Sequence, residues 1–157
     1  MSSISTLLAV RDGLVAALKA ATWPTAAPTV YGGVPAVDEL PAECIIIGGA
    51  TSATRQHATS RGTQPRADET YRLECALSVY VAGDGTAAAQ CATRTDALWA
   101  VILDTVRAAV TQPAAGGPLG IAQVYALDID TYDVEDLNTP ESNEMLITFY
   151  VRAVARV

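Results

Sequence analysis

Two segments in which apolar and polar residues alternate constrain the fold of this 157-residue chain more than any other feature. In TYRLECALSVYVAG the apolar positions are Tyr71, Leu73, Cys75, Leu77, Val79 and Val81, and in EMLITFYVRAVARV they are Met145, Ile147, Phe149, Val151 and Ala153. Side chains of a β-strand point alternately to opposite faces, so this period predicts strands with one buried and one exposed face. Such strands need other elements to cover the buried face.

Two amphipathic helices are predicted to provide that cover. Apolar residues recur three or four apart from Ile4 to Leu18 and again from Thr86 to about Val110. Prolines 24, 28, 35 and 41 exclude a long helix between them, where we expect a short extended piece around Val30–Val34. The run CIIIGGA then predicts a buried strand that closes on Gly48 and Gly49.

The order of these segments indicates the fold class. Helix, strands, helix and strands predict an α+β domain, with a mainly antiparallel sheet, both helices on one face and long β-hairpin excursions. The last two strands, IAQVYALDIDTYDV and EMLITFYVRAVARV, are expected to form such a hairpin around the polar EDLNTPESN. The length fits one domain spanning residues 1–157.

Composition argues against several classes of function. A net charge of −7 opposes a nucleic-acid reader, which needs a basic face. The three cysteines lack CxxC spacing, so we expect buried thiols and no zinc site or disulfide framework. The N-terminus does not fit a signal peptide, and no apolar run reaches the ~20 residues of a membrane span, so a soluble protein is expected. The known catalytic motifs are absent and His57 is the single histidine, which predicts a non-enzyme without a cofactor.

A basic segment, ATSATRQHATSRGTQPRAD from Ala50 to Asp68, separates two strand-like segments. It has no carboxylate before Asp68 and is expected to be one long polar loop, with His57 a solvated loop residue. Loops of this length in compact domains are functional or disordered. Its candidate residues for a subunit or tail-tube interface are Arg55, His57, Arg61 and Arg66.

An acidic segment from Asp128 to Glu144 contains seven carboxylates and no Lys or Arg. One interpretation is a divalent-cation site, although Tyr132 stands where an EF-hand loop has a ligand. A second is a solvated strand end that favours solubility. In a third, the basic segment contacts this surface, either in a neighbouring copy or in the same chain, because Arg favours carboxylate partners. The candidate residues for a lumen or interface are Asp128, Asp130, Asp133, Glu135 and Asp136.

Several phrases, in their order along the chain, resemble the tail terminator proteins of long, flexible-tailed bacteriophages. They are an N-terminal helix, VYGGVPAVDELPAECIIIGGA, a polar excursion, YRLECALSVYV, a helix with AAAQCATRTDALWAVI, and PLGIAQV before the last hairpin. This resemblance covers nearly the whole chain and rests on element order and short apolar phrases.

The resemblance implies a structural virion protein of the tail or neck, assembled in the host cytoplasm, that forms a hexameric ring on the tail tube and stops its polymerisation. Its implied partners are other copies of itself, the major tail tube protein and the head-tail connector or stopper protein. DNA would pass through an acidic lumen without specific binding, and no membrane is involved. Another neck component, such as a tail-completion or head-tail connector protein, and a small divalent-cation-binding module remain alternatives.

Overall fold

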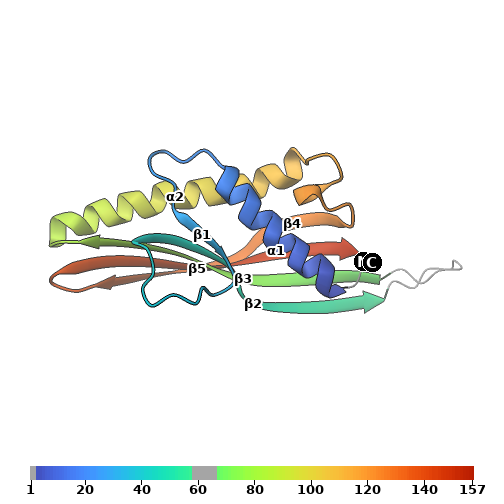
Figure 1. Ribbon diagram of the computed structural model, residues 1–157, viewed down its shortest axis with the longest axis horizontal. Coiled ribbons are helices and arrows are strands. Elements are labelled where there is room, and N and C mark those ends of the chain that lie inside the picture. Colours follow the sequence, from blue (N-terminus) through green and yellow to red (C-terminus); the bar gives the residue numbers. More distant parts are fainter. Residues whose placement is uncertain (1–2, 58–66) are drawn as a thin grey trace, which may run out of the picture.

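The computed structural model describes residues 3–57 and 67–157, which form one five-stranded sheet with both long helices on the same face (Figure 1). The strand order is β1-β2-β3-β5-β4, and only the β1–β2 pair is parallel. The elements are α1 (Ser3–Ala20), β1 (Thr29–Gly32), β2 (Glu43–His57), β3 (Ala67–Ala82), α2 (Gly85–Thr111), η1 (Pro118–Gly120), β4 (Val124–Asn138) and β5 (Ser142–Arg156). The predicted α+β class is confirmed.

The central strand β3 organises the core through the alternation read from the sequence. Its register with β5 runs without a break from Asp68 opposite Arg156 to Ala82 opposite Ser142. The predicted apolar positions from Tyr71 to Val79 are at most 1 % exposed on the face covered by the helices, called the helix side below. The opposite face, called the far side, carries polar and charged residues such as Arg72 and Glu74.

Each helix buries a stripe against the sheet. In α1 the buried apolar residues are Val10, Leu14 and Leu18, whereas Leu8 is 42 % exposed. Helix α2 starts at the N-cap Asp84, whose carboxylate accepts a hydrogen bond from the Thr86 N–H at 3.0 Å. No helix in the described part of the chain is long and apolar enough to span a membrane.

The start of α2 and the turn of the β4–β5 hairpin are fixed to each other. The side chain of Asn143, 3 % exposed, donates hydrogen bonds to the Gly83 and Asp84 carbonyls at 3.1 Å each. The Gly83 N–H donates to the Glu141 carbonyl at 3.0 Å. These hydrogen bonds link residues of the β4–β5 hairpin directly to the residues just before α2. The hairpin turn and the N-terminus of α2 are therefore held together as one unit.

Strand β2 continues well past the point where the sequence predicted its end. Gly48 and Gly49 form a β-bulge, since Ile47 lies opposite Cys75 and Ala50 lies opposite Glu74. Pairing then resumes up to His57 opposite Ala67. The expectation of a loop over Ala50–Asp68 is therefore wrong for residues 50–57 and 67–68, and residues 58–66 lie outside the described part.

The bulge predicts a difference between its two glycines. Gly48 has φ +74°, a left-handed conformation that costs other residues about 1–2 kcal/mol, and a Cβ there would lie 3.2 Å from Arg11 Cδ. We expect Gly48→Ala to lower the free energy of unfolding by that amount in denaturant titrations. Gly49→Ala, whose Cβ would meet no atom within 3.4 Å, is the matched control. Equal losses for both variants would contradict this role of Gly48.

Candidate functional site

Residues 50–57 of the basic segment belong to β2 at the edge of the sheet, and their arginine, Arg55, forms an ion pair. The Arg55 Nε donates to Glu69 Oε1 on β3 at 2.9 Å, with exposures of 51 % and 4 % for the two side chains. His57 is the last residue of β2 and no longer a loop residue. Arg61 and Arg66 lie outside the described residues. Arg55 remains half exposed despite this ion pair, so its role at a subunit or tail-tube interface stays a prediction.

Glu69 is the centre of a buried polar cluster at this end of the sheet. Its other oxygen, Oε2, accepts a hydrogen bond from the Tyr71 hydroxyl at 2.6 Å. Burial, followed by the hydrogen bond and negative charge of Glu69, raises the pKa of Tyr71 to about 12. Arg55 supplies the positive charge that compensates the buried carboxylate, so it ties the edge strand β2 to the core strand β3.

The acidic candidates lie on β4, where they divide between the two faces of the strand. Asp128, Asp133 and Glu135 are opposite Arg152, Thr148 and Leu146 on the far side, whereas Asp136 is opposite Met145 on the helix side. Asp130 occupies a register shift between Ile129 and Thr131. A regular strand alternates its side chains, so these five carboxylates do not converge on one point.

Two of the five carboxylates have cationic partners on other strands. Asp130 pairs with Arg72 of β3 at 3.3 Å, and Asp128 approaches Arg152 of β5 at 3.9 Å. The Arg72 guanidinium also stacks on the Tyr150 ring, 3.9 Å from its centroid. The segment is thus acidic in sequence but partly neutralised in the sheet.

The other three carboxylates, Asp133, Glu135 and Asp136, are exposed and form no ion pair with another described residue. Across residues 3–57 and 67–157 there is no group of three or more His, Cys, Asp or Glu side chains that could hold a metal ion. This arrangement gives no support to the divalent-cation interpretation. It leaves a carboxylate-rich edge toward the hairpin turn.

The two candidate regions lie on opposite edges of the antiparallel part of the sheet. Among the residues that the structure describes, β2 beyond Gly49 pairs only with β3, and β4 pairs only with β5. Two strands, β3 and β5, separate the two regions (Figure 1). Contact between their described parts within one chain, which the sequence left open, is therefore not observed.

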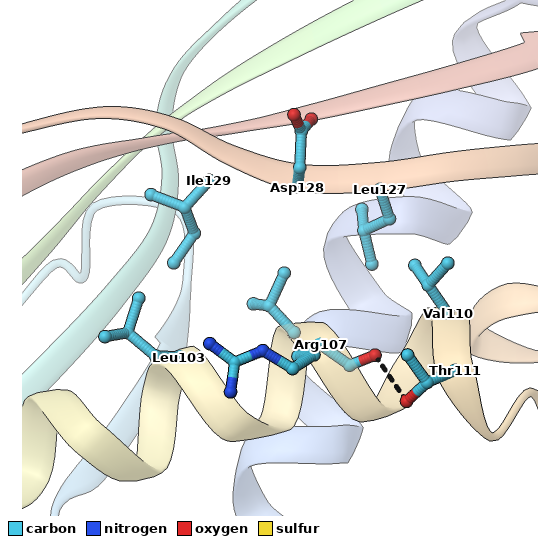
Figure 2. A pocket seen from close by; sticks show the side chains of 8 residues that line it. Leu103, Arg107, Val110, Thr111, Leu127, Asp128 and Ile129 are labelled. Atoms are coloured by element: carbon cyan, nitrogen blue, oxygen red, sulfur yellow. Dashed lines mark hydrogen bonds between the residues drawn. The ribbon is translucent and has the colours of Figure 1, made fainter.

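A shallow apolar groove of about 340 Å³ runs between α2 and β4. Figure 2 shows Leu127 and Ile129 of β4 pointing toward α2, while Asp128 between them points the opposite way. Leu103, Val106 and Val110 of α2 complete the apolar lining, with Arg107 beside it. The acidic edge strand thus has an apolar side next to its charged far side.

The three cysteines are buried and free. Burial raises the pKa of each thiol, and it raises that of Cys75 to about 12. A thiol with a raised pKa is a poor nucleophile, so these residues act as small apolar core groups.

Sequence reasoning missed Glu69, Arg72 and Arg152 as partners of the candidate residues. Arg72 and Arg152 are charged residues in the alternating strand segments, and the alternation places both on the exposed face, whereas Glu69 directly precedes the first of these segments. Their pairing depends on strand order and register, which one sequence does not reveal.

No family model and no curated protein sequence matches this chain.

The Arg55–Glu69 pair predicts that Arg55 contributes to folding stability. Arg55→Ala leaves a buried carboxylate with one partner fewer, and we expect it to lower the free energy of unfolding by about 1–3 kcal/mol. Arg107→Ala, which removes an exposed pair with Asp104 at 3.5 Å, should change it by less than about 0.5 kcal/mol. Urea titration of both variants measures the difference, and an Arg55→Ala protein as stable as the control would refute the role.

The buried tyrosine predicts a loss of stability at alkaline pH. Because the folded-state pKa of Tyr71 is raised from 10 to about 12, folding retains a proton that the unfolded chain releases in this range. Its contribution is complete below pH 10 and is lost as the pH rises to about 12, by roughly 2 kcal/mol. Tyr71→Phe should show a shallower decline than the native chain in denaturant titrations over this window. Tyr80→Phe, an exposed tyrosine, is the control, and identical slopes for the native chain and Tyr71→Phe would contradict the assignment.

Proposed function

We propose that this chain is a structural, non-enzymatic subunit that assembles head to tail into a closed ring. The observation that carries the proposal is the placement of two unlike edges on opposite sides of one sheet. Residues 50–57 contain no carboxylate, and residues 128–136 contain five and no cation. Surfaces that differ and lie apart on one subunit favour head-to-tail contacts, which close into rings when the rotation between copies allows it.

Within this class, we propose the role of tail terminator in the neck of a long, flexible-tailed bacteriophage. The resemblance in element order supports this role, and the observed order of helices and strands agrees with the order on which that resemblance rests. The ring would cap the tail tube, stop its polymerisation and meet the head-tail connector. A net charge of −7 suits a lumen that DNA traverses without adhering.

Another neck component, a tail-completion or head-tail connector protein, is the alternative within the same class. Such a component would form the same kind of ring as a tail terminator but would bind a different partner protein. The unmodified chain mixed with tail tube protein distinguishes the two in native mass spectrometry. A terminator caps tubes and limits their length, whereas a connector forms rings and leaves tube growth unchanged.

Charge reversal on the acidic edge tests the head-to-tail contact. Asp133 and Glu135 are exposed and unpaired among the described residues, so Asp133→Lys with Glu135→Lys should leave the unfolding midpoint nearly unchanged. The same variant should weaken self-association at least about tenfold in light scattering, because it replaces negative charge on the acidic edge with positive charge that repels the arginines of the basic segment in the next copy.

Asp38→Lys with Glu39→Lys is the matched control, since it makes the same charge change at exposed positions between β1 and β2. Equal weakening by both pairs would indicate a general effect of net charge. A chain that stays monomeric at every concentration, with and without tube protein, would rule out the ring.

A further inference from the structure

Two backbone edges of the antiparallel sheet have no strand beside them among the described residues. Strand β1 covers β2 only at Cys44–Ile47, so Ala50–Gln56 presents one row of backbone groups outward. Strand β4 also presents a row of backbone groups outward, because β5 is its only partner among the described strands. Open edges pair readily with strands of other chains unless side chains or bulges oppose it.

The strand directions allow one edge to bind the other in a neighbouring copy. Strands β2, β3, β5 and β4 are each antiparallel to the next, so β2 and β4 run in opposite directions. If a second copy is placed beside the first by rotation about an axis along the strands, its β4 meets β2 in antiparallel orientation. The sheet then continues with the same kind of pairing that it has inside each subunit.

The hydrogen-bonding pattern of the two edges is also compatible. Ala67 and Val157 exchange backbone hydrogen bonds of 3.2 and 3.0 Å, so Ala67 bonds toward β5 and the next residue, Asp68, toward β2. Asp68 lies opposite Gln56, and therefore Gln56, Thr54 and Ser52 bond inward. The outward-facing backbone groups of β2 belong to Thr51, Ala53 and Arg55.

On the other edge, the Arg156 N–H donates to the Gln123 carbonyl at 2.9 Å, so Arg152, four residues earlier, also bonds toward β4. Its partner Asp128 bonds inward, which leaves the backbone groups of Leu127 and Ile129 outward. Residues paired across an antiparallel ladder share one face of the sheet. On both edges the outward-bonding residues have side chains on the helix side, so the faces of two joined sheets coincide.

The side chains of the two edges complement each other. Thr51 and Ala53 are small and would lie beside Leu127 and Ile129 at the α2–β4 groove. Residues 50–57 lack proline and have a single charged residue, Arg55, which is paired with Glu69 inside the subunit, so this edge has little protection against pairing. The carboxylates of β4 disfavour β4 against β4, since like charges would face each other.

We propose that Ala50–Gln56 of one copy pairs antiparallel with β4 of the next, so that the sheet is continuous across each subunit boundary. This inference rests on the proposed ring and names its interface. One row of paired residues runs Ser52, Arg72, Arg152 and Asp128 across the sheet. In a ring whose copies are at equal height, Ser52 of one subunit therefore meets Asp128 of the next. Because β1 covers β2 at Cys44–Ile47, the shared stretch of β4 is limited to Val124–Asp130, and β4 turns away from β2 at the register shift between Ile129 and Thr131.

Disulfide cross-linking of the full-length chain tests this contact. The Ser52–Asp128 contact would be a non-hydrogen-bonded pair, with Cα atoms about 4.5 Å apart and within the range of a disulfide. We expect Ser52→Cys mixed with Asp128→Cys to give cross-linked dimers under mild oxidation, at several-fold higher yield than Ser52→Cys mixed with Thr139→Cys in the hairpin turn. Thr54→Cys mixed with Asp128→Cys tests the alternative register in which β2 is displaced by two residues relative to the neighbouring β4. The native cysteines are buried, so they do not compete.

A proline substitution gives an independent readout. Ala53→Pro removes an outward-facing backbone N–H without removing a hydrogen bond to β3, whereas Ala53→Val retains this N–H. Ala53→Pro should abolish assembly at concentrations where Ala53→Val assembles, while both monomers unfold at similar denaturant concentrations.

The outcomes separate this inference from the proposed function. Rings that form without β2–β4 cross-links, and that tolerate Ala53→Pro as well as Ala53→Val, would overturn the shared sheet and leave the ring intact. Cross-linking of Ser52→Cys to itself as the main product would indicate β2–β2 pairing and would also overturn it. A chain that never assembles would overturn both.

Discussion

The pairing of β3 with β5 is the interaction on which the rest of this structure depends. It runs unbroken over nearly the whole of both strands and fixes which side chains face the helices. The apolar row from Tyr71 to Val79 is buried because of this register, as are its β5 counterparts from Ile147 to Ala153, and a shift by one residue would exchange the two faces. The helices, the edge strands and the charge distribution all follow from it.

Most of the architecture could be predicted from the sequence because the period-two signal is strong where one face is buried. The α+β class, the two helices and the final hairpin are of this kind. The extension of β2 was not predicted, because Ala50–Gln56 is exposed on both faces and has no apolar alternation. Gly48 and Gly49 resemble a strand end in the sequence, whereas in the sheet they form a bulge.

The candidate site was only partly predictable for a related reason. Charge runs are visible in a sequence, but the partners that neutralise them come from strands far away in the chain. Arg55 finds Glu69 and Asp130 finds Arg72 only because β2, β3, β5 and β4 are arranged in this order. The carboxylates that remain unpaired among the described residues, Asp133, Glu135 and Asp136, cluster toward the hairpin turn. The difference between the paired and the unpaired carboxylates along β4 could be recognised only from the structure.

The hydrogen bonds from Asn143 to the start of α2 have a consequence for how this molecule meets a partner. They hold the end of the β4–β5 hairpin in place before any contact is made. A preorganised surface loses little conformational entropy on association, so most of the free energy gained from contacts at this edge is retained. The acidic edge is therefore rigid before binding, and any segment that becomes ordered on association belongs to the partner.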